Sequence, residues 1–223
     1  VFLLFSLQAQ YRIGLKGGVN VSDMNMSFQN IDIDVYQPKG GFQIGFVGEW
    51  MFNSRYGVQA ELQYMLTKSD IDSYKFLENM EAPSELLLSG YTEIHTLQIP
   101  FYFKMKFTLS PTANFYVMPG LYASYSPSAY QHVALRHEDE SLKLKWSLFD
   151  YQVHLVDKTE SNSYLQSRYN AGFVLETGVE INEWGVGASL RKTLTNMGAF
   201  GYMGVGKVKT EMWVANLSVS YLF

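Results

Sequence analysis

Apolar and polar residues alternate with a period of two along most of this chain. In the clearest stretch, Leu97 to Phe107, bulky apolar residues occupy every odd position and mostly polar ones the even positions. This period places successive side chains on opposite faces of a β-strand, whereas a helical face repeats every three to four residues. The pattern therefore predicts a strand with one strongly apolar face.

The same alternation predicts eight strands, at about residues 11–21, 41–52, 56–67, 97–107, 115–125, 169–181, 184–190 and 213–223. Short turns at about 53–55, 110–114 and 182–183 separate longer connections at about 22–39, 70–91, 131–166 and 194–210. Outer-membrane barrels have this arrangement, with short periplasmic turns and longer extracellular loops. We therefore predict an all-β fold: a closed eight-stranded antiparallel up-and-down transmembrane β-barrel, integral to a bacterial outer membrane, with both termini in the periplasm.

Two of the long connections alternate again, at residues 31–35 and 142–156. We interpret these segments as hairpins that extend the barrel wall above the membrane. The alternative is that residues 131–166 hold two further spanning strands, which would give ten.

The two faces of the predicted strands differ in side-chain volume. One is dominated by Phe, Tyr, Trp, Leu and Ile, and the other mixes charged residues with glycines: Gly14, Gly18, Gly45, Gly120, Gly172, Gly185 and Gly187. The interior of an eight-stranded barrel is just wide enough for side chains to fill it. We therefore expect the apolar face to contact lipid. The alternative is a soluble lipocalin-like barrel that binds a hydrophobic ligand inside.

Aromatic residues gather where the predicted strands meet the short turns. We expect an aromatic girdle at that membrane face, as in other outer-membrane barrels. Its predicted members are Tyr11, Phe52, Tyr56, Phe107, Phe115, Trp184 and Phe223.

The polar face carries nine charged residues that we predict to point into the lumen. They are Arg12, Lys16, Glu49, Glu61, Lys104, Lys106, Glu176, Glu180 and Arg191. Five are positive and four negative, and buried charges need paired, hydrogen-bonded partners. We therefore expect a salt-bridge network that closes the lumen. The alternative is an ion or proton path, or a carboxylate pair for acid–base chemistry.

Several function classes find little support in the composition. The chain has no cysteine, which excludes thiol catalysis, disulfides and Cys-ligated metals. Its net charge of −4 and lack of a basic stripe argue against nucleic-acid binding. Residues 201–208 imitate a phosphate-binding loop, but Val208 replaces the hydroxyl that would bind magnesium.

None of the four histidines shows the spacing of a two-ligand metal site. The competing enzyme hypothesis is a hydrolase at the barrel rim, using loop His132, His137 or His154 with Asp139 or Asp157. We expect no enzyme activity, no cofactor and no metal.

The chain begins with an apolar run, Val1 to Phe5, followed by Ser-Leu-Gln-Ala-Gln. This resembles the end of a secretory signal peptide. We therefore interpret residues 1–9 as its remnant and residues 10–223 as a single barrel domain. Beyond this stretch, no run of eighteen apolar residues could form a membrane-spanning helix.

Three motifs resemble those of the PorT-type outer-membrane β-barrel family of Bacteroidetes. They are Lys16-Gly-Gly-Val-Asn-Val-Ser22, Leu97-Gln-Ile-Pro-Phe-Tyr-Phe-Lys104 and the terminal Tyr221-Leu-Phe223. The resemblance covers residues 10–223 and implies a small closed barrel in the outer membrane. It also implies that Phe223 is read by the barrel-assembly machinery, and it provides no catalytic residues.

By elimination, the long loops remain as the place for function. The longest contains aromatic residues among charges, which is typical of partner-binding surfaces. Its candidate binding residues are Trp146, Phe149, Tyr151 and Tyr164. We therefore expect a non-enzymatic structural or binding role, with outer-membrane lipid, lipopolysaccharide and an unidentified extracellular or envelope protein as partners.

Overall fold

The structure, a computed structural model, describes residues 10–28, 31–33, 36–71, 87–137, 140–149, 151–152, 162–163, 167–195 and 208–223. Residues 1–9, predicted to be a signal-peptide remnant, lie outside this part. Within the described ranges, no helix is long and apolar enough to cross a membrane.

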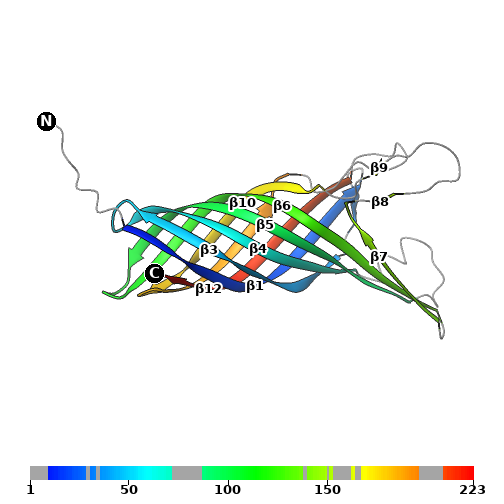
Figure 1. The fold of residues 1–223 in the computed structure, drawn as a ribbon, viewed down its shortest axis with the longest axis horizontal. Helices are drawn as coiled ribbons and strands as arrows, with labels where there is room; N and C mark the ends of the chain where they lie inside the picture. Colours follow the sequence, from blue (N-terminus) through cyan, green and yellow to red (C-terminus); the bar gives the residue numbers. More distant parts are fainter. Residues whose placement is uncertain are drawn as a thin grey trace.

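Eight long strands form a closed ring (Figure 1). They are β1 (Gln10–Phe28), β3 (Tyr36–Met51), β4 (Tyr56–Ile71), β5 (Leu87–Thr108), β6 (Ala113–His137), β10 (Tyr169–Ile181), β11 (Trp184–Thr193) and β12 (Val208–Leu222). Neighbours in sequence pair antiparallel, and β1 pairs with β12 while β6 pairs with β10. The predicted closed eight-stranded up-and-down barrel is confirmed.

The short turns lie together at one end of the barrel, which we call the turn end; the opposite end is the loop end (Figure 1). Asn53 Oδ1 accepts hydrogen bonds from the backbone N–H groups of Arg55 and Tyr56, both at 2.8 Å, and so closes one turn. Asn182 has a φ of 53°, a left-handed conformation that asparagine tolerates, and it closes another. Polar turn residues thus fix the connections at the turn end.

Four short strands lie at the loop end: β2 (Ile31–Ile33), β7 (Glu140–Ser147), β8 (Tyr151–Gln152) and β9 (Asn162–Ser163). β7 pairs with the outer part of β6, from Tyr130 to His137, while β10 pairs with the inner part, from Ala113 to Tyr125. β2 pairs with the end of β1. Both elements extend the wall, as expected, and the ten-strand alternative is wrong because β7 adds no strand to the ring.

The ring strands are longer at the loop end than the alternation predicts. β1 continues to Phe28 and β6 to His137, whereas the predicted ends are residues 21 and 125. The β5–β6 register shifts between His95 and Leu97, and the β3–β4 register between Lys39 and Phe42. An extra residue at a bulge moves every later side chain to the other face, so the period-two signal breaks there although the strand continues.

The predicted lipid-facing residues point outward, and the charged face points into the barrel. Ile13, Phe101 and Val186 are between 56% and 67% exposed, while Glu49 and Lys104 are at most 2% exposed. Glycines on the inner face make room for large residues from other strands. A Cβ atom at Gly178 or Gly187 would collide with the hydroxyl of Tyr116.

Candidate functional site

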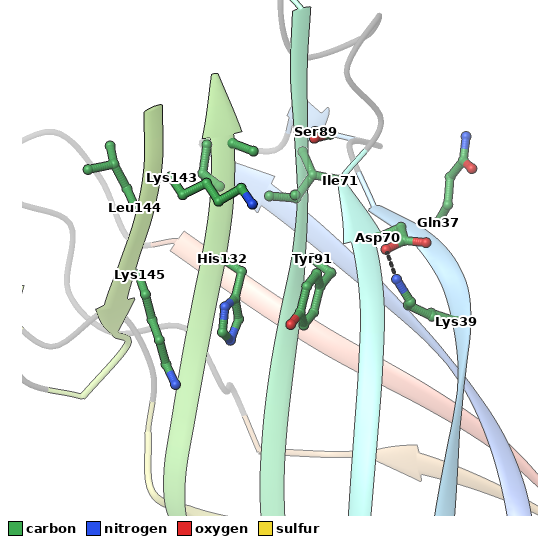
Figure 2. Close-up of a pocket in the computed structure, with 13 residues that line it drawn as sticks. Gln37, Lys39, Asp70, Ile71, Ser89, Tyr91, His132, Lys143, Leu144 and Lys145 are labelled. Carbon is green, nitrogen blue, oxygen red and sulfur yellow. Dashed lines mark hydrogen bonds and ion pairs between the residues drawn. The ribbon is translucent and has the colours of Figure 1, made fainter. Parts of the chain in front are cut away.

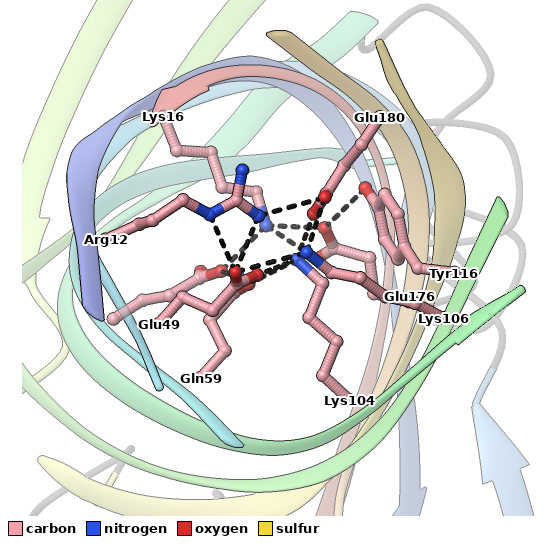
Figure 3. A network of polar contacts seen from close by, with 10 residues as sticks. Arg12, Lys16, Glu49, Gln59, Lys104, Lys106, Tyr116, Glu176 and Glu180 are labelled. Carbon is pink, nitrogen blue, oxygen red and sulfur yellow. Dashed lines mark hydrogen bonds and ion pairs between the residues drawn. The ribbon is translucent and has the colours of Figure 1, made fainter. Parts of the chain in front are cut away.

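The half of the lumen nearest the turn end holds a compact cluster of charged side chains (Figure 3). Arg12 donates to Glu49 and Glu180, at 2.5 and 3.0 Å. Lys106 donates to the same two carboxylates, at 3.1 and 2.7 Å, and Lys104 pairs with both as well. Three cations from β1 and β5 thus share two carboxylates from β3 and β10.

A second cluster lies next to the first and is centred on Lys16. Its ammonium donates to Glu61 at 3.0 Å and to both oxygens of Glu176, at 2.7 and 2.6 Å. Gln59 joins the two clusters, because its amide N–H donates to Glu61 at 2.6 Å while its oxygen accepts from Lys104 at 3.1 Å. Eight of the nine predicted lumen charges therefore lie in one continuous network.

Arg191 does not pair with a carboxylate, contrary to the prediction. It is 1% exposed, and its guanidinium donates to the amide oxygens of Gln98 and, at 2.8 Å, Gln63. In the described part of the chain, no carboxylate oxygen lies within 4.0 Å of it. Gln63 in turn donates to Glu61, so a neutral amide transmits the attraction between Arg191 and that carboxylate. Alternation predicts the face of Arg191 but not its height, which depends on the stagger between strands.

Toward the loop end, the lumen holds an apolar cluster among buried polar side chains such as Thr96 and Ser126. Its buried cluster consists of Met65, Ile94, Ala129, Leu148, Phe149, Met212 and Val214. Leu148 and Phe149 follow β7 and are held at the barrel mouth, since the Leu148 N–H donates to the carbonyl of Ala129 at 3.0 Å. Met65, Met212 and Val214 are apolar residues at positions of the otherwise polar inner face. The sequence could therefore have predicted an apolar cluster inside the lumen from these three positions.

Phe149 was predicted to be an exposed binding residue, and that is wrong. It is 1% exposed, and the guanidinium of Arg168 lies 4.4 Å from the centre of its ring. The Phe149 N–H donates to Ser147 Oγ at 3.2 Å, a local turn that directs the chain back over the barrel mouth. The side chains of Trp146 and Tyr151, and all of Tyr164, lie outside the described residues.

Two cavities lined by described residues lie along the lumen. One of about 590 Å³ opens at the turn end, and Arg12, Lys106 and Glu180 form part of its lining. The other, between Arg191 and the apolar cluster, measures about 10 Å³, which is room for roughly one water molecule. Buried Lys16, Lys104 and Gln98 are among the side chains in the lumen.

Aromatic rings surround the turn end in contact with one another. Tyr11 stacks on Trp50 at 5.5 Å between ring centres, and Trp50 packs edge-on against Phe52 at 5.1 Å. Other contacts join the remaining predicted members to partners: Tyr56 to Phe103, Phe107 to Phe115, Trp184 to Tyr221 and Tyr221 to Phe223. The girdle therefore also includes Trp50 and Tyr221, which the sequence reasoning did not name as members.

The described histidines lie on the outer wall. His95 Nδ1 is 2.6 Å from the Tyr64 hydroxyl and its Nε2 is 3.0 Å from Glu93, so both ring nitrogens have partners. His132 stacks on Tyr91 at 4.4 Å. Burial and then the nearby Lys145 lower the pKa of His132 below its ordinary value.

Most of the other residues predicted to carry chemistry lie outside the described part of the chain. The His137 side chain, His154, Asp139 and Asp157 lie outside the described residues, as does nearly all of the phosphate-loop imitation at 201–208. Among the residues that are described, no group of three or more His, Cys, Asp or Glu side chains could hold a metal ion.

A family model described as "Outer membrane protein beta-barrel domain" matches residues 8–198. No curated protein matches the chain.

Three solved structures resemble the fold at low sequence identity. The outer membrane protein OprG from Pseudomonas aeruginosa is 12% identical, with 96% of this chain and 95% of that chain covered and a TM-score of 0.49. Neisserial surface protein A is also 12% identical, with 95% and 97% covered and a TM-score of 0.43. The outer membrane protease OmpT from Escherichia coli is 8% identical, with 98% of each chain covered and a TM-score of 0.42.

Proposed function

Because this chain belongs to the outer membrane protein beta-barrel domain family, we propose that it is a non-enzymatic barrel with a closed lumen that binds partners at its loop end. The family match and the apolar outer wall establish an integral outer-membrane protein. The closed lumen, the binding role and the orientation in the membrane belong to the proposal.

The closed lumen is supported by one observation: side chains occupy the barrel interior both near the turn end and near the loop end. Eight charged residues cross the interior nearest the turn end, and the apolar cluster with Leu148 and Phe149 fills the mouth at the loop end. Ions would need to displace paired charges near the turn end and buried apolar side chains near the loop end. A transport function is therefore disfavoured, and the outer surface remains for binding.

We further propose that the turn end faces the periplasm and the loop end faces outside. Barrels of this kind have short periplasmic turns and longer extracellular loops. Gln10 pairs with Met51 and Phe223 donates its N–H to Ile13, both at the turn end, so this orientation would place both residues on the periplasmic side. The PorT-type motifs support a Bacteroidetes origin for the chain.

The competing class is a hydrolase at the rim. It requires a histidine with one ring nitrogen free to activate a nucleophile. His95 has both nitrogens engaged. His132 Nε2 has no hydrogen-bond partner among the described residues, but it is buried and its ring lies flat against Tyr91, so no described hydroxyl is placed for it to activate. The binding role is therefore the better supported of the two.

Orientation can be tested with cysteine labels, because the chain has no cysteine of its own. Thr195, exposed at the loop end, and Ser54, exposed at the turn end, form a matched pair of positions. In intact cells, a membrane-impermeant maleimide should label Thr195→Cys and spare Ser54→Cys, while both should react after the cells are broken. The opposite labelling pattern would contradict the orientation.

The binding role can be tested in cells once a phenotype of deleting the gene is found. We expect that removing residues 136–160 abolishes the phenotype-restoring activity. Replacing His132 by phenylalanine, which keeps a ring stacked on Tyr91, together with His137 and His154 by glutamine should preserve it. Loss of activity in the triple histidine variant, with the barrel still assembled, would favour the hydrolase.

A further inference from the structure

Beyond the apolar band, β3 to β7 continue as a wall whose outer face carries a groove (Figure 2). In register across these five strands lie Gln37, Asp70, Tyr91, His132 and Lys145. The neighbouring row toward the barrel contains Lys39 and Lys68, and Lys143 lies on the opposite side of the first row. The groove has a volume of about 700 Å³.

We call this surface the basic face and define it by Lys39, Lys68, Tyr91, His132, Lys143 and Lys145. Two acidic residues lie within it, and each is paired: Lys39 with Asp70 at 2.6 Å and Lys68 with Glu93 at 3.4 Å. Lys143 and Lys145 are exposed, and no carboxylate of the described residues lies within 4.0 Å of either ammonium. The face therefore keeps an excess of two positive charges.

Aromatic rings hold the lysine side chains in place. The Lys39 ammonium lies 4.7 Å from the centre of the Tyr91 ring, and that of Lys145 lies 4.1 Å from the Tyr130 ring. His132 stacks on the other side of Tyr91. Cations held over rings lose less conformational freedom on binding an anion, so the face is organised in advance.

At its β3 edge, the basic face lies immediately beyond the lipid-facing surface. On β3, Lys39 is three residues from the outward-facing Phe42, which is followed by Ile44 and Phe46 on the same face. At roughly 3.3 Å of rise per residue, three residues place the lysine within about 10 Å of the apolar band. The phosphate groups of lipid headgroups occupy this level of a bilayer.

We propose that the basic face binds the phosphate-bearing sugar headgroup of an outer-leaflet glycolipid. Lys143 and Lys145, which have no carboxylate partner among the described residues, match phosphate, and the groove is larger than phosphate alone would need. Ser89 in its lining supplies a hydroxyl for hydrogen bonds with the sugar. This inference rests on the proposed orientation, which places the loop end at the outer leaflet.

The test uses the purified full-length barrel in detergent, with diphosphoryl lipid A as the probe. Affinity is measured by thermophoresis, and bound lipid is counted by native mass spectrometry. The double variant Lys143→Gln/Lys145→Gln should bind lipid A at least about tenfold more weakly than the unmodified barrel. The matched control is Lys192→Gln. Lys192 lies on β11, away from the groove, and its ammonium is 5.0 Å from the centre of the Trp213 ring on β12. Its affinity should stay within about twofold.

Further binding measurements identify which phosphate-bearing molecule the groove recognises. Dephosphorylated lipid A should bind weakly, with no difference between the double variant and the unmodified barrel. If phosphatidylglycerol or millimolar inorganic phosphate competes as well as lipid A, the proposal of glycolipid binding is wrong. Unchanged affinity of the double variant for lipid A would also overturn it. The Thr195→Cys and Ser54→Cys labels report orientation without lipid A, so failure of the site and failure of the orientation are distinguishable.

Discussion

Replacing the buried Lys16 by methionine should strongly destabilise the barrel. Lys16 is 3% exposed, and its ammonium makes three hydrogen bonds to Glu61 and Glu176. Methionine has a similar length but no charge. The substitution therefore removes the cation and leaves two buried carboxylates facing each other.

The expected size of the effect follows from this geometry. Removing one partner of a buried ion pair typically costs about 3–5 kcal/mol, because the remaining charge stays desolvated. Arg191 reaches Glu61 only through the amide of Gln63, so it compensates weakly. We expect a loss of about 3–5 kcal/mol in the free energy of unfolding.

Two matched variants sharpen the measurement. Lys39→Met removes the exposed pair with Asp70, whose side chains are 38% and 43% exposed, and should cost only about 0–1 kcal/mol. Adding Glu176→Gln to Lys16→Met removes one stranded carboxylate and should recover part of the loss.

Unfolding of the barrel in lipid vesicles by urea can be followed through the fluorescence of its four tryptophans. We expect stability to fall in the order unmodified barrel, Lys39→Met, the double variant Lys16→Met/Glu176→Gln, and Lys16→Met. If Lys16→Met costs no more than Lys39→Met, the lumen network does not stabilise the fold as argued.

Three further predictions concern other parts of the barrel. Phe149→Ala should lower the free energy of unfolding in urea by about 3–5 kcal/mol, since a fully buried ring is lost; a loss under about 1 kcal/mol would show that the ring is not packed at the mouth. Gly187→Ala should cost about 1–3 kcal/mol in the same assay by pushing the Tyr116 hydroxyl aside, and less in a Tyr116→Phe background. An NMR titration should give His132 a pKa below 6.5 that rises in Lys145→Gln. Because the folded state then binds this proton less readily than the unfolded chain, His132 should lower stability as the pH falls below 6.5, and a pKa above that value would contradict the burial argument.

Much of the fold was predictable because alternation marks the strands and separates their two faces, and side-chain volume then assigns the bulky face to lipid. The strand Tyr169–Ile181 was predicted at its observed bounds, since it contains no bulge and ends at the tight turn with Asn182. β5 and β6 were predicted too short because their pairing shifts near His95. A single strand's pattern cannot show whether a break marks an end or a bulge.

The candidate site was less predictable, since it depends on how strands are staggered around the ring. Alternation places Arg191 on the inner face, but only the three-dimensional register brings it to Gln63 and Gln98 instead of a carboxylate. The position of Phe149 depends on a turn at Ser147 that folds the chain back over the mouth. The basic face joins residues from five strands, and no local motif indicates that they meet.

The central claim, that side chains close the lumen, is tested most directly by recording currents across a planar lipid bilayer containing the purified barrel. The account predicts no stable conductance above that of detergent alone at any holding potential, with folding of the same sample verified by a heat-dependent mobility shift on gels. Long-lived, reproducible conductance steps from the folded barrel would contradict it, because they would require a continuous water path through both the charged network and the apolar mouth.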